Sequence, residues 1–586
     1  MRVCRAAEAE RRAQALGSIP SLVETDTQER STLREFGDEA WAGVTSWEWE
    51  KIFSVEAVGG RTVRRIPQRA RSGVLDALCC ILKCLKSQPG DEATTLLLLA
   101  FARLILAVPP KPGIGQKVLI TERLGAFWEG RWRELFDSAM VAAWPAVRPL
   151  SYTCSDQDPD AIRLSRCRSR CKVGEWSRGL ACLTAGELAR PSEAMVQSLR
   201  EKHLASAGKV PQWVRDFTID TAQRPSLTTD ILARAIHTAA RASAAGPSGW
   251  VTEHLRDTFL TEPSCLSLLL EVFNQWVAGQ VPERARPWLA ASNLVGFSKP
   301  NGDVPPVAIG EVLPRILARA LCISLRPAMV SYFLPCNQLG AGTRVGVEIL
   351  THSFWSTLAT HPDLCALQID VANAFNSFHR HVMFDGLRES PFSGMIPFLR
   401  VFYGTPSDLY LLAGPFVQSL ESARGSRQGD PLGPFLFAFT QQQVMEPVTR
   451  EFKDLLSSAM QTIPIFWGQR LGFWRLLGCC GSGWSGWGWR CRHTRAGFGS
   501  ARARRWSGHC HWGCSRWMRV LLWWACLLGR RFGGGPATGA ASTVAGATAM
   551  APIARPPSDG FTPPRHCSFS AADVPRPDYA AAFEGG

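Results

Sequence analysis

The stretch Asp-Val-Ala-Asn-Ala-Phe, residues 370–375, closes an apolar run that extends over residues 364–369. A short apolar run bounded by turn-forming residues is typical of a buried strand. A carboxylate at the end of such a strand, followed five residues later by an aromatic side chain, can place a metal ligand beside a shape-selective pocket. The simpler alternative is a strand-terminal Asp that caps the turn after it.

A second informative segment, Gly-Ser-Arg-Gln-Gly-Asp-Pro-Leu-Gly-Pro, occupies residues 425–434. Gly429 lets the backbone approach another group closely, because it has no Cβ atom. Pro431 and Pro434 fix the path of the chain into a hydrophobic helix that is expected to start near Phe435. By itself, a turn rich in Gly and Pro is an ordinary loop in most proteins.

In this order the two segments resemble the palm of a reverse transcriptase of the non-LTR retrotransposon kind. Further matching stretches place the resemblance over roughly residues 170–455. The resemblance implies an α+β fold with right-hand polymerase-like fingers and a partial palm. It also implies RNA-templated DNA synthesis, with an RNA template, a DNA primer and deoxynucleoside triphosphates as partners and Mg²⁺ or Mn²⁺ as cofactor.

The resemblance gives Asp370 the central role, as catalytic residue and metal ligand. Polymerases use two divalent ions, held by carboxylates, to activate the attacking oxygen and to neutralise the leaving phosphate. Phe375 would pack under the sugar and reject a 2′-hydroxyl, for which a large rigid side chain is suited. A core Phe remains the alternative interpretation of that position.

Other residues receive binding roles from the same resemblance. Those that would contact the incoming nucleotide are Lys299, Asn373, Ala374, Phe375, Gln428 and Gly429. Arg315 and Arg319 lie one turn apart on an expected helix and would contact template phosphates, which position a nucleic acid without specifying its sequence. A solvated helix face is the alternative for both arginines.

Two departures from the family pattern predict a chain without activity. Where the family carries an Arg that holds the triphosphate, this chain has Pro305, which can neither donate a hydrogen bond nor carry charge. The third palm motif, an aromatic residue followed by a paired Asp-Asp on a hairpin, is missing. The acidic residues after Asp430 include no adjacent pair; they are Glu446, Glu451, Asp454, Asp559, Asp573, Asp578 and Glu584. One carboxylate cannot hold two metal ions.

Two non-enzymatic interpretations stay open, a nucleic-acid-binding remnant and a translation product without function. The net charge of +15 would suggest an anionic partner, but residues 455–558 contain 13 Arg and no Lys, Asp or Glu. Outside that segment, 52 basic residues face 50 acidic ones. Basicity of the whole chain is therefore poor evidence about the polymerase-like part.

Four regions are predicted along the 586 residues. Residues 1–70 are a weakly structured segment, 71–225 a helical region, and 226–460 the fingers and partial palm. Residues 461–586 are rich in Arg, Trp, Gly and Cys and then in Ala, Pro and Gly. They contain ten of the 22 Trp between residues 467 and 524, which is unusual for a basic tail. We expect this tail to be disordered or translated from an unselected reading frame.

Periodicity and turn signals predict the elements inside these regions. Helices are expected at 74–85, 93–108, 120–143, 176–203, 229–244, 253–260, 266–277 and 312–325, and a loop at 150–170. Strands are expected at 294–298 and 307–309, joined by a hairpin turn at 300–303 that contains Asn-Gly.

The cysteines and the apolar segments bear on compartment and metals. The 19 Cys are scattered without a disulfide framework, and the Cys/His spacing at 491–493 and 509–514 matches no common zinc motif. The first residues lack an apolar signal region, which predicts an intracellular protein, nuclear or cytoplasmic, with reduced thiols. The apolar segments at 94–109 and 520–528 are too short to span a bilayer, so no membrane partner is expected.

Overall fold

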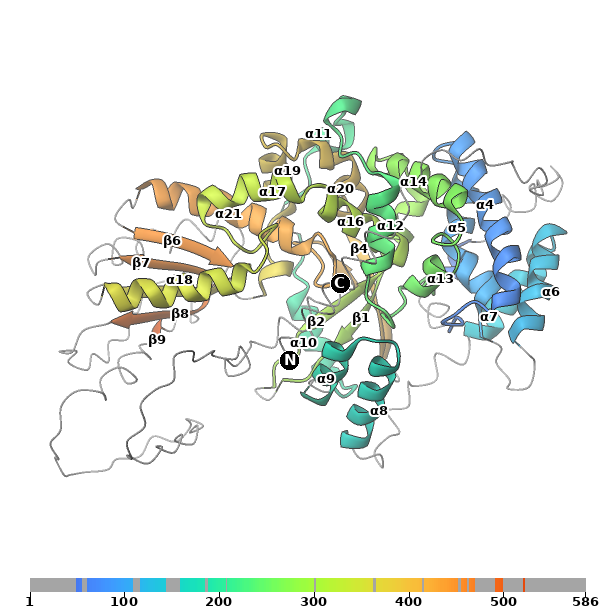
Figure 1. Ribbon diagram of the computed structural model, residues 1–586, viewed down its shortest axis with the longest axis horizontal. Coiled ribbons are helices and arrows are strands. Elements are labelled where there is room, and N and C mark those ends of the chain that lie inside the picture. Colours follow the sequence, from blue (N-terminus) through green and yellow to red (C-terminus); the bar gives the residue numbers. More distant parts are fainter. Residues whose placement is uncertain are drawn as a thin grey trace, which may run out of the picture.

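The computed structural model describes residues 49–54, 61–108, 116–143, 159–184, 188–206, 208–299, 302–361, 365–371, 373–413, 416–451, 455–460, 463–468, 491–498 and 520–521. Helices and two sheets make up this part of the chain, which confirms the predicted α+β class. In Figure 1 the N-terminal helices lie at one end and a five-stranded sheet at the other. A four-stranded sheet lies between them.

The N-terminal helices pack as a layer around α5 (Glu92–Leu106), whose residues from Ala93 onward are all buried. Asp91 caps α5 by accepting a hydrogen bond of 2.8 Å from the Thr94 N–H. The helices packed with it are α4 (Arg71–Ser87), α6 (Gln116–Trp128) and α7 (Trp132–Ala143). The helix expected over 120–143 is therefore two helices, separated at Gly130, whose φ of 69° favours glycine.

One disulfide corrects the prediction that the thiols are all reduced. Cys79 on α4 is bonded to Cys265 on α14 (Pro263–Val277), with their Cα atoms 5.7 Å apart. The two cysteines are 186 residues apart in sequence, so their proximity depends on how α4 packs against α14. No spacing rule could have paired them.

A helical hairpin differs from the predicted organisation of residues 150–203. The predicted loop contains α8 (Pro159–Lys172), and the single helix expected over 176–203 is α9 (Trp176–Thr184) followed by α10 (Glu193–Lys202). Helix α8 is polar on nearly all sides, so periodicity gave no apolar stripe to detect. It folds as a helix because it packs against α9.

The central sheet has the strand order β2-β1-β4-β5. Strands β1 (Ser292–Gly296) and β2 (Pro306–Gly310) form the predicted antiparallel pair. Strand β4 (Ser407–Ala413) pairs with β1 in parallel and with β5 (Phe416–Ser422) in antiparallel fashion. The expected strand pair is thus confirmed, with boundaries shifted by one or two residues.

The second sheet places β3 (Cys365–Val371) between β7 (Ile463–Gly468) and β8 (Cys491–Phe498), antiparallel to both. Its outer strands are β6 (Leu455–Met460) and β9 (Val520–Leu521). Strands β7, β8 and β9 lie in the tail after residue 460, which the sequence predicts to be disordered or translated from an unselected reading frame. Most of the remaining tail, and most of residues 1–70, lie outside the described residues.

The other helices surround the central sheet. In chain order they are α3 (Trp49–Ile52), α11 (Gln212–Asp216), α12 (Thr229–Thr238), α13 (Thr252–Asp257), α15 (Arg286–Ala290), α16 (Val312–Ser324), α17 (Arg326–Phe333), α18 (Gly346–Thr360), α19 (Arg380–Arg388), α20 (Ile396–Tyr403) and α21 (Gly433–Glu451).

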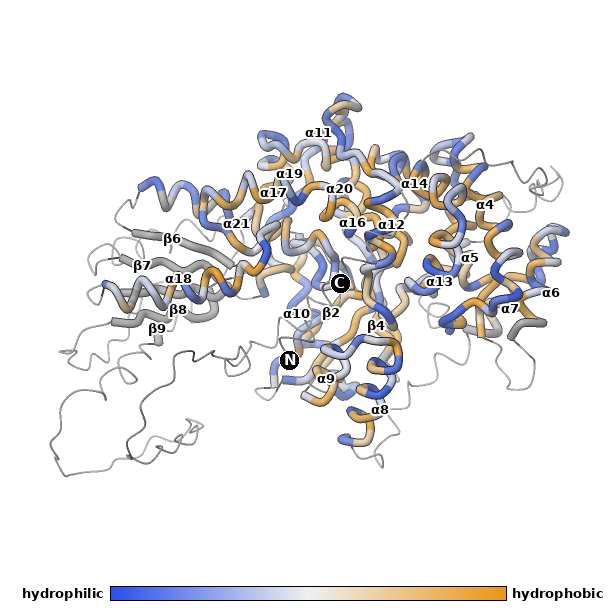
Figure 2. The backbone as a smooth tube through the Cα atoms, in the orientation of Figure 1, coloured by the Kyte–Doolittle hydropathy of each residue, from blue (hydrophilic) through white to orange (hydrophobic). Residues whose placement is uncertain are grey.

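One hydrophobic core extends from the N-terminal helices through α14, α16 and α20 to α21, so these elements form a continuous body. Figure 2 shows the hydrophobic and hydrophilic segments along these helices. Of the described helices, none is by itself long and apolar enough to cross a bilayer. Helix α16 and residues Arg326–Cys336, which are bent by 59° relative to each other, are together long and apolar enough by length and composition only.

Candidate functional site

The two motif segments lie against each other. After β3 the chain turns at Asn373, which has a φ of 50°, and enters the short helix η6 (Ala374–Asn376). The Ser426 N–H donates a hydrogen bond of 2.7 Å to the Phe375 carbonyl, and the Gly425 N–H donates one of 2.9 Å to the Phe378 carbonyl. The exit from β3 and the bend at residues 425–430 are thereby joined by their backbones.

Glycine is required at two positions of this bend, Gly425 and Gly429. Gly425 has a φ of 59°, and a Cβ atom there would lie 2.0 Å from the Phe375 oxygen. Gly429 has a φ of 120°, and a Cβ atom there would lie 2.3 Å from the Ala308 oxygen. The Ala308 N–H in turn donates a hydrogen bond of 2.8 Å to the Gln428 carbonyl. The bend is therefore fixed between η6 and β2.

Phe375 lies in the core of this junction. It is 7% exposed, and its ring centroid lies 5.5 Å from that of Phe437 on α21. The core interpretation accounts for this burial. The sugar-selecting role implied by the resemblance stays a prediction, and it requires that part of the ring face the site.

Asp370 lies near the end of β3, in the middle of the second sheet. Its backbone is in register with His493 on β8, and Gln368, two residues before it, is in register with Ile465 on β7. The hairpin β6–β7 follows α21 directly and pairs with β3. None of the strands β6 to β9 contains an Asp or a Glu. Within this sheet, Asp370 is thus the one acidic residue.

Asp430, the acidic residue of the bend, is engaged by other side chains and by the backbone. Its carboxylate accepts hydrogen bonds from the Tyr403 hydroxyl and, at 2.9 Å, from the Leu432 N–H, and it lies 3.9 Å from the Arg427 guanidinium. No group of three or more His, Cys, Asp or Glu side chains in the described part of the chain could hold a metal ion. The role of Asp370 as a ligand of two metal ions stays a prediction.

A cluster of buried side chains lies behind the bend. The Cζ atom of Arg380 is 5.2 Å and that of Arg427 is 5.1 Å from the centroid of the Tyr403 ring. Burial lowers the pKa of Arg380 to about 9 and raises the pKa of Tyr403. Arg380 donates to the carbonyls of Gly425 (3.0 Å) and Thr405 (3.1 Å). The cluster thus ties α19 and α20 to the bend.

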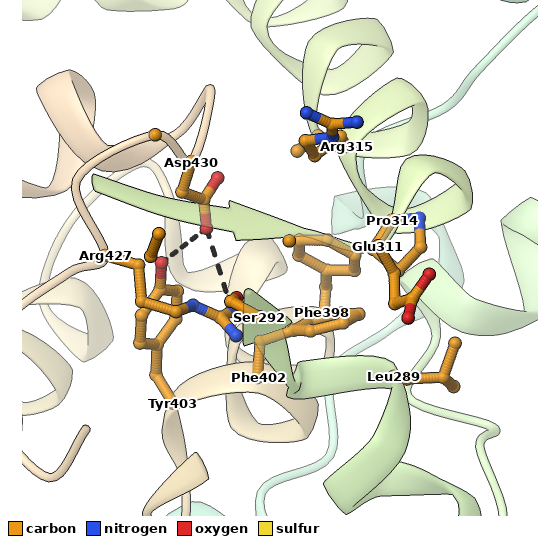
Figure 3. A pocket seen from close by; sticks show the side chains of 14 residues that line it. Leu289, Ser292, Glu311, Pro314, Arg315, Phe398, Phe402, Tyr403, Arg427 and Asp430 are labelled. Atoms are coloured by element: carbon orange, nitrogen blue, oxygen red, sulfur yellow. Dashed lines mark hydrogen bonds and ion pairs between the residues drawn. The ribbon is translucent and has the colours of Figure 1, made fainter. Parts of the chain in front are cut away.

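A cavity of about 30 Å³ lies beside this cluster, between the bend, β1 and α16 (Figure 3). Glu311, at the start of α16, lines it together with Ser292, Arg315 and Asp430. The Glu311 carboxylate accepts hydrogen bonds from the N–H of Ser248 (2.7 Å) and from its hydroxyl. Burial raises the pKa of Glu311 to about 7.

The predicted phosphate-binding arginines are engaged with backbone oxygens. Arg315 donates a hydrogen bond of 2.8 Å to the Ala244 carbonyl, and Arg319 donates one of 3.0 Å to the Thr238 carbonyl. Burial lowers the pKa of both guanidinium groups. Both residues hold the end of α12 and the segment that follows it, and contact with a template stays a prediction.

The remaining predicted contacts lie around the same part of the molecule. The Lys299 N–H donates a hydrogen bond of 3.0 Å to the Asp303 carbonyl within the β1–β2 connection. The Asn373 side chain donates one of 2.6 Å to the Lys202 carbonyl at the end of α10. Ala374 is buried in η6. The structure therefore brings Asn373, Ala374, Phe375, Gln428 and Gly429 to one junction.

Sequence reasoning missed Arg380, Tyr403 and the role of Glu311. Arg380 is the first residue of α19, and in the sequence it looks like an ordinary solvated cation. Tyr403 is the last residue of α20, and at the end of an apolar stretch it looks like an ordinary core residue. All three residues lie within the range of the resemblance, but no local signal marks them, because their partners come from distant parts of the chain.

Comparison of the sequence with protein-family models gave no match, and comparison with curated proteins gave none.

Proposed function

We propose that this chain is a retroelement-derived reverse-transcriptase-like protein that keeps a nucleotide-facing bend and lacks DNA synthesis. The single observation that carries the proposal is the backbone link between Ser426 and Phe375. It joins the segment after Asp370 to the segment that contains Gln428 and Gly429, which are the two parts that the resemblance assigns to one palm.

The loss of activity follows from the hairpin next to β3. In the family, the hairpin after the corresponding helix supplies the paired Asp. Here the hairpin β6–β7 has the strand sequences Leu-Leu-Ser-Ser-Ala-Met and Ile-Pro-Ile-Phe-Trp-Gly. Losing metal-borne charge stabilisation raises a phosphoryl-transfer barrier by several kcal/mol. Asp370 alone does not compensate for that loss.

Primer extension tests this proposal. A labelled DNA primer on an RNA template is incubated with the chain, deoxynucleoside triphosphates and either Mg²⁺ or Mn²⁺. We expect no extension product from the wild type or from Asp370→Ala. Extension by the wild type that the variant loses would show an active enzyme and overturn the proposal. Failure to obtain a folded chain would instead favour a translation product without function.

A second candidate function, a non-catalytic nucleic-acid-binding protein, is favoured by the α8–α9 hairpin. Residues 159–184 contain six basic and two acidic residues, and both acids are paired. Asp160 lies 2.9 Å from Arg163, and Glu175 accepts the Arg241 N–H at 2.9 Å. Trp176 is 61% exposed. The hairpin projects from the lower edge of the molecule in Figure 1.

Three cations of α8 are exposed and have no ion-pair partner among the described residues; they are Arg166, Arg168 and Lys172. Unpaired cations beside an exposed indole ring suit a single strand, because phosphates bind the cations and bases stack on the ring. The end of the hairpin that carries the turn is fixed, since Arg170 donates a hydrogen bond of 2.9 Å to the Arg241 carbonyl.

Binding of labelled single-stranded RNA at several salt concentrations tests this second function. We expect Arg168→Gln with Lys172→Gln to lower the slope of log affinity against log salt by about 1.4, which is two phosphate contacts on a single strand. Lys83→Gln with Arg133→Gln changes the same charge on α4 and α7 and should leave the slope unchanged. Equal slopes for both double variants would place RNA binding elsewhere.

A further inference from the structure

Tyr403 links parts of the molecule that are far apart in sequence. Its hydroxyl donates to the Asp430 carboxylate, and both Arg380 and Arg427 lie over its ring (Figure 3 shows Tyr403, Arg427 and Asp430). All three of these ring partners and the ring itself are largely withdrawn from solvent. A cation over an aromatic face is attracted by the ring quadrupole, more strongly where water is excluded.

Each partner of the ring holds a different part of the bend. Arg380 donates through Nε to the Gly425 carbonyl, at the first residue of the bend. Asp430, the last residue of the bend, accepts a hydrogen bond from the Tyr403 hydroxyl. Arg427, between them, donates to the Ala290 carbonyl just before β1. The residues that hold both ends and the middle of the bend therefore all contact Tyr403.

The Nε, Nη1 and Nη2 atoms of Arg380 all donate hydrogen bonds to fixed acceptors. Its Nη2 atom donates to the Ser422 carbonyl (2.9 Å) and hydroxyl (3.1 Å), and its Nη1 atom donates to Thr405. A planar fork with several fixed acceptors is a geometric constraint that a lysine cannot reproduce. Arg380 thus sets the distance between the end of β5 and the bend.

We propose that Arg380 and Tyr403 are positioning residues. They hold the bend in the position at which Gln428 and Gly429 lie against Ala308 of β2. The inference rests on the proposed function for the identity of the ligand, a deoxynucleoside triphosphate. The geometry of the bend is independent of any ligand. The Ala308 N–H donates a hydrogen bond of 2.8 Å to the Gln428 carbonyl, and we expect this bond to weaken when either end of the bend is released.

Hydrogen–deuterium exchange of peptides that cover residues 424–433 tests the positioning role without a ligand. Tyr403→Phe keeps the ring under both cations and removes only the hydroxyl group, which donates a hydrogen bond to the Asp430 carboxylate. Its matched control is Tyr410→Phe, because Tyr410 is also buried and donates one hydrogen bond, of 3.3 Å, to the Phe53 carbonyl. Tyr410 lies on β4, and among the described residues its hydroxyl donates to Phe53 and not to the bend.

We expect Tyr403→Phe to accelerate exchange of the bend peptides about tenfold, since a hydrogen bond to a charged group is lost. Tyr410→Phe should leave these peptides at the wild-type rate. Arg380→Lys should accelerate exchange at the Gly425 end, because the charge remains and the fork is lost. Wild-type rates in both Tyr403→Phe and Arg380→Lys, or equal acceleration in the Tyr410→Phe control, would overturn the positioning role.

Binding of a fluorescent deoxynucleoside triphosphate separates this inference from the proposed function. If the wild type binds, we expect Tyr403→Phe to weaken binding about tenfold and Tyr410→Phe to leave the affinity unchanged. Equal affinities of the wild type and Tyr403→Phe would overturn the link between bend position and nucleotide. If the wild type does not bind, the proposed function fails, while the exchange rates still decide whether Arg380 and Tyr403 position the bend.

Discussion

Glu311 is a buried carboxylate whose charge is disfavoured by its surroundings. Burial raises its pKa from 4.5 to about 7, although Ser248 donates two hydrogen bonds to it. The unfolded chain therefore releases this proton at a lower pH than the folded chain does. The free energy of unfolding contributed by this group decreases as the pH rises from about 4.5 to about 7. We expect Glu311→Gln to remove that decrease in urea unfolding.

His254 has the opposite dependence on pH. Burial lowers its pKa from 6.5 to about 4, and the ring lies between the Val251 N–H and the Val63 carbonyl. Its contribution to stability is complete above pH 6.5 and is lost as the pH falls towards 4. The two contributions partly cancel in the wild type. In Glu311→Gln, we therefore expect stability to rise steadily between pH 4 and pH 6.5, and a flat profile would contradict this assignment.

The bend is the element whose conformation depends most on glycine. In Gly425→Ala, the alanine must adopt a left-handed φ, and its Cβ atom would clash with the Phe375 oxygen. We therefore expect a loss of roughly 3 kcal/mol or more in the free energy of unfolding. Gly90 also has a positive φ, of 82°, but no atom lies within 4 Å of an added Cβ. Gly90→Ala should cost only about 1–2 kcal/mol. Equal losses in urea unfolding would show that backbone strain, not the contact with η6, governs Gly425.

Elements with a local signal were predictable from the sequence, and those without one were not. The β1–β2 pair, α16 and the bend follow from apolar periodicity, Asn-Gly and Gly/Pro chemistry. Helix α8 was missed because its stability comes from packing rather than from an apolar stripe. The Tyr403 cluster was missed because its four members come from three separate segments. The candidate site was thus predictable as a set of segments, but not in its buried polar contacts.

At the scale of the whole molecule, the bond between Cys79 and Cys265 joins the N-terminal helices to the region that contains the central sheet. A crosslink that closes a long loop limits the freedom of the unfolded chain and typically contributes about 2–4 kcal/mol. We expect a reducing agent to lower the urea midpoint of the wild type by a corresponding amount. Cys79→Ser with Cys265→Ser should be insensitive to the reductant. A wild type that is equally stable with and without reductant would contradict this prediction.

The parallel pairing of β1 with β4 has a consequence for synthesis on the ribosome. Strand β2 follows β1 closely, so this hairpin can form as soon as both have emerged. The other edge of β1 must wait for Leu409, which is translated on the order of ten seconds later at ordinary elongation rates. During that interval the nascent chain presents unpaired N–H and C=O groups along β1, which are a template for association with other chains. A chaperone that shields this edge should therefore raise the yield of folded protein.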